Sequence, residues 1–272
     1  MGAANGNALR IWRAKGQSGL ELRVGSSFEH PYPPHWHEDY FLSAITGGVG
    51  HFHFRSTHHR ATPGTLVFVA PAEVHSHCDS EGGRSFRSMH VSVSMMAGIF
   101  REIDGRRGVL PDMPSVLIAG DHMHETFLQL HRAFDDGDSR LQRDSMLLGF
   151  FRRLAARVRK ENVPKYRDAC EISGVRSARE FLHAHFDCEV SLRDLAAIAG
   201  LSPYYFHRVF CRTLGLPPHA YQLQVRIMRA KSMIRDGRPL AHVAAATGFA
   251  DQSHFTRHFK RLTGTTPARY AG

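Results

Sequence analysis

An internal repeat near the C-terminus constrains this chain more than any other feature, because two copies of one pattern must form the same supersecondary unit. Residues 191–201 match residues 239–249 at an offset of 48 positions, and after one inserted residue the match continues at an offset of 49. Each copy holds apolar residues at helical spacing, then a glycine, and then a second amphipathic run. We predict that each copy forms a helix, a turn and a second helix.

The small residues of the repeat favour a helix-turn-helix arrangement. Gly200 and Gly248 occupy matched positions and suit a left-handed helix end. Ala196 and Ala244, which are also matched, would let the second helix cross the first closely. In this motif the second helix, here within residues 203–214 and 252–262, can enter a major groove of DNA.

The charge of the chain agrees with an anionic partner for the repeat. The net charge of +10 alone would allow nucleic acid, a membrane surface or an acidic protein. Residues 191–272 carry 12 Lys and Arg against 3 acids, a net of +9, whereas residues 1–190 have a net of +1. No run approaches the 18 apolar residues of a membrane span, so we expect no membrane partner.

Residues 173–272 resemble the DNA-binding domain of AraC-type transcriptional regulators. The strongest match is residues 245–270, AATGFADQSHFTRHFKRLTGTTPARY, and residues 195–210 with Gly215 and Tyr221 match as well. The resemblance implies an all-α domain in which two helix-turn-helix units are joined by one long helix at about 217–235. Its second helices would lie in successive major grooves of double-stranded DNA, about 34 Å apart.

The resemblance assigns DNA contacts to ten side chains of the second helices. The predicted base contacts are Tyr204, His207 and Arg208 in the first copy and Gln252, Ser253, His254 and Arg257 in the second. Arginine suits guanine edges and glutamine suits adenine edges. Arg212, Lys260 and Arg261 lie further along the helices and would hold phosphates.

Simpler interpretations exist for several of these residues. Taken alone, Arg208 would be part of a solvated helix surface, but its repetition at Arg257 and the local charge favour DNA contact. For His207 and His254, a base contact and a bystander position both stay open. The matched phenylalanines are predicted to be core residues; they are Phe206, Phe210, Phe255 and Phe259.

The first part of the chain reads as β-structure followed by helices. Short apolar or alternating runs separated by glycine and proline predict several strands in a sandwich or barrel. The runs are residues 20–24, 40–46, 51–55, 65–69 and 86–94. Amphipathic helices are predicted at about 122–135 and 139–160, and the polar residues 161–172 are predicted to be a linker.

Two segments of this part resemble the cupin-like sensor domain found in many AraC-type regulators. They are residues 34–40, PHWHEDY, followed by Gly47 and Gly48, and residues 63–75, PGTLVFVAPAEVH. The resemblance implies an effector-sensing β-barrel over residues 1–120, with residues 121–160 as a helical dimerisation segment and residues 173–272 as the DNA-binding domain. We therefore predict an α+β multidomain chain.

Ten of the 20 histidines lie between residues 30 and 90. His35 and His37 share one face of a strand, and with His75 they would form a three-imidazole site for a divalent transition metal. The glutamate that metal-binding cupins place after the pair is missing, since Phe41 and Leu42 stand there. An effector pocket lined by these three histidines and His53, a pH sensor, and hydrogen-bonded structural histidines are the alternatives.

We predict a cytoplasmic, bacterial-type transcription factor and not an enzyme. The four cysteines lack CxxC spacing, which fits a reducing compartment. The partners would be promoter DNA, a small-molecule effector, RNA polymerase and a second copy of the chain. The apolar stripe at residues 146–158 would be the dimer surface, and the alternative is that this stripe packs against the barrel of its own chain. The alternative is a metal-dependent cupin enzyme, such as an oxygenase, or a metal or pH sensor, fused to a DNA-binding domain.

Overall fold

The computed structural model describes most of the chain. The described residues are 8–14, 17–54, 57–104, 116–119, 122–135, 139–160 and 173–272. They divide into two compact units, built mainly from residues before 166 and from residues 166–272. The predicted linker, residues 161–172, lies outside the described residues.

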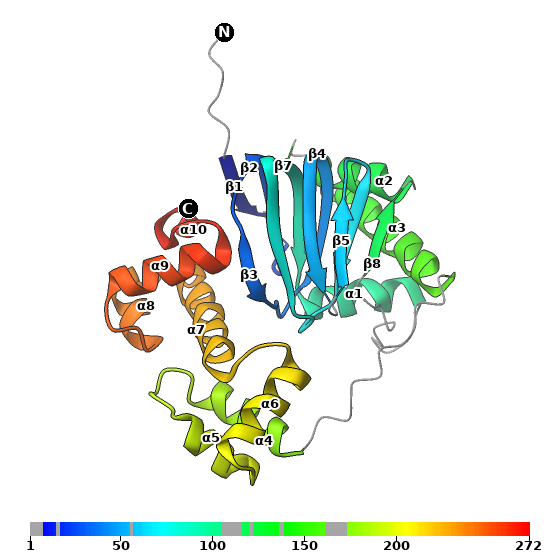
Figure 1. Cartoon of the computed structure of the whole chain (residues 1–272). Helices are drawn as coiled ribbons and strands as arrows, with labels where there is room; N and C mark the ends of the chain where they lie inside the picture. The colour runs from blue at the N-terminus through cyan, green and yellow to red at the C-terminus, as the bar shows by residue number, and fades with distance from the viewer. Residues whose placement is uncertain are drawn as a thin grey trace. The chain divides into compact units, whose positions relative to one another are not determined.

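The N-terminal unit is built on one eight-stranded sheet (Figure 1). Its strands are β1 (Ala8–Arg13), β2 (Leu20–Phe28), β3 (Tyr32–His35), β4 (Tyr40–Phe54), β5 (Thr57–Ala61), β6 (Thr65–Val69), β7 (His75–Val91) and β8 (Val116–Ala119). The order is β1-β2-β7-β4-β6-β8, with β3 paired to β7 and β5 paired to β4. The β2–β7, β4–β7 and β4–β6 ladders are antiparallel.

The predicted barrel is wrong in one respect, because the described strands form an open sheet. β1 and β8 stand at the two ends of the strand order, and no pairing of described residues joins them. The sequence reading also split β4 into two strands at its glycines. The ladder with β7 instead continues through Gly47 and Gly48 with register shifts, since glycine allows a bulge inside a strand.

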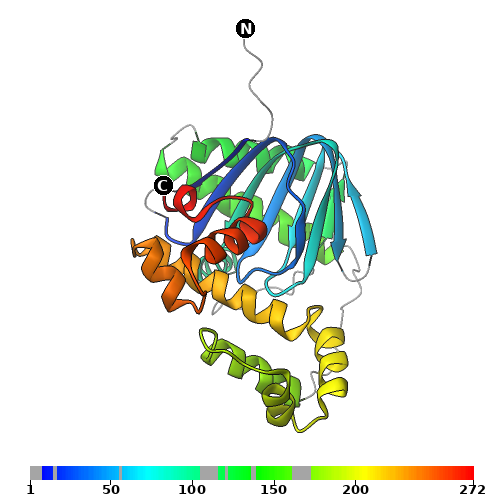
Figure 2. The same cartoon turned by 60° about the vertical axis from the view of Figure 1, so that its left-hand side comes forward.

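Three helices cover one face of the sheet (Figure 2). They are α1 (Val93–Asp104), α2 (His122–Asp135) and α3 (Arg140–Lys160). The predictions for α2 and α3 are confirmed, whereas α1 was not predicted. Phe127 of α2 and Phe150 of α3 pack into one core with Leu42 and Phe68 of the sheet, and all four side chains are fully buried or nearly so.

This core changes the interpretation of the apolar stripe in α3. Phe150, Phe151 and Leu154 are at most 1% exposed, because they face the sheet of their own chain. Most described residues of the predicted dimer stripe are therefore interior residues, which agrees with the alternative that the stripe packs against its own chain, whereas Met146 and Leu148 are half-buried. Leu141, at the start of α3, is a large apolar side chain that stays exposed, at 78%.

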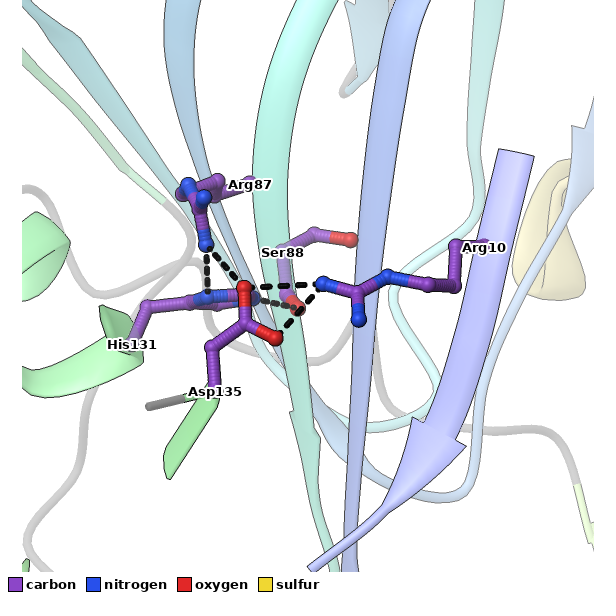
Figure 3. Close-up of polar contacts among 5 residues, drawn as sticks. All are labelled: Arg10, Arg87, Ser88, His131 and Asp135. Carbon is purple, nitrogen blue, oxygen red and sulfur yellow. Dashed lines mark hydrogen bonds and ion pairs between the residues drawn. The ribbon is translucent and has the colours of Figure 1, made fainter. Parts of the chain in front are cut away.

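A polar network fastens α2 to the sheet (Figure 3). Asp135 accepts hydrogen bonds from Arg10 of β1, at 2.6 and 2.8 Å, and from Arg87 of β7, at 3.1 Å. Arg87 also donates to Nδ1 of His131 at 3.0 Å, and Nε2 of His131 donates to the Ser88 carbonyl at 3.2 Å. These bonds fix a neutral tautomer of a fully buried His131.

The C-terminal unit is helical, as predicted. Its helices are α4 (Ser173–Ala184), α5 (Leu192–Ala199), α6 (Pro203–Leu214), α7 (Pro218–Arg235), α8 (Leu240–Ala246), α9 (Gln252–Thr263) and α10 (Pro267–Ala271). The long helix α7 joins the group α4–α6 to the group α8–α10 (Figure 1). The four matched phenylalanines of α6 and α9 are fully buried, which confirms their predicted place in the core. None of the described helices is both long and apolar enough to cross a membrane.

Candidate functional site

The first helix-turn-helix unit owes its shape to side-chain caps. The Ser191 side chain accepts from the Asp194 backbone N–H while the Asp194 carboxylate accepts from Ser191 in return, which is a capping box. These hydrogen bonds hold the pKa of Asp194 below its usual value. Gly200 ends α5 with φ of 67°, and Ser202 caps the N-terminus of α6.

The second unit reaches the same shape with different residues. Gly248 again has positive φ, 74°, which confirms the prediction for both glycines. Asp251 caps α9 by accepting from the backbone N–H of His254 at 2.7 Å. α8 begins after Pro239 instead of after a side-chain cap. The second helix of each unit therefore starts at a capped turn directly after its glycine.

The ten predicted DNA-contacting residues are accessible on these helices. Nine are exposed: Tyr204, His207, Arg208, Arg212, Gln252, Ser253, Arg257, Lys260 and Arg261. The tenth, His254, is half-buried because its ring packs against Phe249 and His258, with centroids 5.5 and 4.6 Å away. Their roles on DNA stay predictions.

Two neighbours of these residues were missed by sequence reasoning. Tyr205 is exposed, and the Arg208 guanidinium lies 5.4 Å from its ring centroid. The spacing of three residues on a helix was the available signal. His258 has its pKa lowered to about 4 by burial and by the positive charges of His254, Arg261 and Arg257. Burial is the larger cause, and the neighbouring cationic side chains of α9 add to it.

The structure brings three of the four candidate effector or metal residues together. One nitrogen from each of His35, His37 and His75 lies within 4.8 Å of the others. They form the one group of three or more potential metal ligands this close among the described residues. With His90, whose ring centroid is 4.8 Å from that of His37, we call them the histidine cluster.

Backbone contacts set the tautomers of two cluster residues. Nδ1 of His35 donates to the Pro33 carbonyl at 2.8 Å, and Nδ1 of His75 donates to the Glu73 carbonyl at 2.9 Å. In this tautomer Nε2 carries the lone pair that a metal ion accepts. Burial lowers the pKa of His75 to about 4, so its imidazole is neutral at neutral pH. Both features fit imidazole ligation of a transition metal.

Phe41 and His90 complete the surroundings of the cluster. The Phe41 ring stacks near His75 and tilts against His37 and His90, at centroid distances of 6.2, 5.6 and 5.0 Å. Phe41 and His90 are register partners on β4 and β7. Sequence reasoning missed His90, because only the pairing of two distant strands brings it to this place.

His53 does not join the cluster. Phe52 and Phe54 are buried, so strand alternation places His51 and His53 on the opposite surface of β4. There His53 is exposed and its ring lies 4.7 Å from that of His58 on β5. The prediction that His53 would share a pocket with the other three is therefore wrong. His58 and His59 both lie on β5.

Comparison with known families identifies both halves of the chain. A family model described as AraC-like ligand binding domain matches residues 19–151, and a helix-turn-helix domain model matches residues 195–272. The chain is 29% identical to the HTH-type transcriptional regulator YbfI of Bacillus subtilis, over 82% of this chain and 81% of YbfI. It is 32% identical to the arabinose operon regulatory protein of Escherichia coli, over 35% of this chain and 34% of that protein.

Solved structures show the same fold. The apo K231A form of ToxT from Vibrio cholerae superposes with a TM-score of 0.63 at 13% identity, covering 94% of this chain and 97% of ToxT. The two matched domains stand in the order that the sequence resemblance implied, and both relatives named above are described as regulators. The chain belongs to the AraC-type transcriptional regulators.

Proposed function

We propose that this regulator reads promoter DNA with α6 and α9, each lying in one of two successive major grooves. The observation that supports this reading is the duplicated helix-turn-helix unit, in which both second helices carry exposed cationic side chains beyond a buried phenylalanine pair. Arg208 and Arg257 take matched positions. Arginine at these positions would contact guanine edges.

Arg257→Ala tests this proposal. We expect a loss of roughly 1–3 kcal/mol in DNA affinity and a relaxed preference at one base pair. Lys260→Ala on the same helix is the matched comparison, and it should weaken all sequences evenly and reduce the salt dependence by about one ion. Both are measured by titration on duplexes that the wild-type chain selects from a random library. An Arg257→Ala chain with unchanged affinity and selectivity would contradict the assignment.

We further propose that the N-terminal unit binds a small-molecule effector. The match of residues 19–151 to a ligand-binding family supports this. Structures of the ToxT fold include one bound to an unsaturated fatty acid and one bound to a naphthalenyl butenoic acid. Small organic acids are therefore the first compounds to test, and the measurement is the affinity of the chain for its selected duplex with and without each acid.

Three finer predictions stay part of the proposal: a homodimer, contact with RNA polymerase, and action in the cytoplasm without catalysis. Light scattering of the purified chain checks the first. Because the stripe of α3 faces its own core, a dimer would use another surface. Turnover in an oxygen-uptake assay of the iron-loaded chain would favour the enzyme alternative instead.

The histidine cluster supports a second candidate, binding of a divalent transition metal by His35, His37 and His75. Its support is the mutual approach of the three nitrogens and the Nδ1 hydrogen bonds that direct Nε2 outward from the backbone. A bound metal would supply a positive charge at this point of the sheet, and the three imidazoles would hold it. The fold offers no carboxylate at the Phe41 position.

Metal titration of the full chain with Zn²⁺ or Ni²⁺ tests this candidate. We expect one equivalent per chain and a loss of affinity of about 100-fold or more in His75→Ala, because a direct ligand matters at least as much as its supporting partners. His53→Ala, which removes an exposed histidine of the same sheet, should leave affinity unchanged. The absence of stoichiometric binding, or equal losses in the two variants, would reject the site.

A further inference from the structure

Arg226 of α7 lies where three backbone segments meet. Its Nε donates to the Phe186 carbonyl at 2.7 Å, and its Nη2 donates to the Cys188 carbonyl at 2.9 Å. Its Nη1 donates to the Gly248 carbonyl at 2.6 Å. The first two carbonyls belong to the turn after α4, and the third belongs to the turn of the second helix-turn-helix unit. One side chain of the joining helix therefore bonds to both halves of the domain.

The two turns also touch each other directly. A Cβ atom on Gly248 would lie 2.3 Å from the Asp187 carbonyl oxygen and 2.8 Å from the Asp187 Cα atom, so only glycine allows this approach. At Gly200, the matched position of the first copy, a Cβ would meet nothing within 4 Å. The close contact is thus specific to the second copy and is not a requirement of the motif.

Gln222, one helical turn before Arg226, adds to the same junction. Its side-chain amide donates to the Cys188 carbonyl at 2.8 Å and to the Phe186 carbonyl at 3.3 Å. The carbonyls of this turn are therefore held from two positions on α7. Since α7 is a continuous helix of 18 residues, the turn after α4 cannot shift along it without breaking several bonds together.

The chemistry of the junction requires arginine. A planar guanidinium presents its N–H donors in a fixed fork, which matches three carbonyls in different directions. Hydrogen bonds from a charged donor are stronger than neutral ones. Burial lowers the pKa of Arg226, while Asp187 and Cys188 raise it. A lysine ammonium at the same place is a single point and cannot serve three separated acceptors at once.

We propose that Arg226 is a positioning residue that fixes α6 relative to α9. It would thereby set the separation of the two short DNA sequences, here called boxes, that α6 and α9 contact. The inference rests on the proposed reading by α6 and α9. α4 and α5 pack against α6 on one side of the junction, and α9 follows the Gly248 turn on the other. A rigid junction would hold the two helices at one constant separation on DNA. Loosening it should relax the spacing and leave the bases read within each box unchanged.

Selection from a random duplex library with the full chain tests this role. The wild-type chain should enrich two boxes at one separation, and adding one base pair between them should lower its affinity about 10-fold or more. For Arg226→Gln we expect the same bases within each box, several separations among the selected duplexes, and a loss of less than about 3-fold for the added base pair. Arg235→Gln, which removes an exposed arginine of the same helix, should keep the wild-type spacing.

The variants separate this role from a simple effect on folding. Circular dichroism shows whether Arg226→Gln is folded. If it is not, Arg226→Lys, which keeps the charge and the aliphatic stem, takes its place, and its affinity is measured on the same duplexes with and without the added base pair. A folded variant that loses as much affinity as wild type for the added base pair overturns the role of Arg226. A wild-type selection that yields a single box would contradict both the proposal that α6 and α9 each contact DNA and the proposal that Arg226 sets their separation.

Discussion

Replacing Gly248 by alanine is expected to destabilise the C-terminal unit by roughly 2–5 kcal/mol. An L-residue in the left-handed region costs about 1–2 kcal/mol, and φ is 74° at this glycine. The new methyl group would also meet the backbone of Asp187 at 2.3 Å. Overpacking of this kind costs typically about 1–3 kcal/mol more. The measurement is hydrogen exchange of the helices α5–α9, which reports the local free energy of opening.

Gly200→Ala is the matched control for this prediction. Gly200 has φ of 67° and space for a Cβ atom, so alanine there costs only the conformational part, about 1–2 kcal/mol. The difference between the two variants isolates the contact between the turns. Equal costs at the two glycines would mean that the turns separate readily, and the junction at Arg226 could not then be stiff.

Acidification is expected to weaken the N-terminal unit through His131. Burial is the main cause that lowers the pKa of His131 to about 4, and Arg87 lowers it further, against hydrogen bonds and the charge of Asp135. An unfolded chain would titrate this histidine near 6.5. The contribution of neutral His131 to the free energy of unfolding is complete above about pH 6.5. It is lost as the pH falls towards 4, because the unfolded state binds the proton first. The shift corresponds to about 3 kcal/mol.

His131→Gln should reduce this dependence by the part that His131 contributes, since an amide can accept from Arg87 and donate to the Ser88 carbonyl without titrating. The part that His75 contributes through its own lowered pKa should remain. His122→Gln, at an exposed histidine of the same helix, should behave like wild type. Denaturant unfolding at several pH values between 7 and 4 measures the difference. Parallel pH curves for wild type and His131→Gln would rule out this role.

The titration of Asp135 falls in a separate pH range. Burial alone would raise its pKa, but hydrogen bonds from Arg10 and Arg87 hold it below the usual 3.8. Its contribution is therefore present at higher pH and is lost only at more acidic pH than that of His131. Extending the unfolding series below pH 4 therefore separates the contribution of Asp135 from that of His131, both of which are labelled in Figure 3.

Local signals in the sequence predicted the helical half well. The residues that permit a left-handed turn act within a few positions, so both turn glycines could be placed in advance. The bounds of α2 were also predicted. These features depend on neighbours along the chain and hardly on the rest of the fold.

Long-range pairings were not predictable in the same way. His90 joins the histidine cluster through the register of β4 and β7. Arg226 donates hydrogen bonds to backbone carbonyl groups. Because every residue carries a carbonyl, the identity of these acceptors cannot be predicted from the sequence. His53 was placed wrongly because register shifts between Ile45 and Gly50 interrupt the alternation of β4. Each case depends on which distant segments meet, and one sequence does not specify that.

The central position of β7 has a consequence for how the chain folds during synthesis. β7 lies between β2 and β4 in the strand order. Both of these earlier strands can therefore form their ladders with β7 only after the chain has been synthesised as far as Val91. The apolar face that they form is covered only when α3 emerges, up to Lys160. Non-local pairing is slow, and uncovered apolar surface attracts aggregation. The sensor half is therefore the part of a nascent chain that chaperones should hold, whereas each helix-turn-helix unit completes itself from adjacent residues.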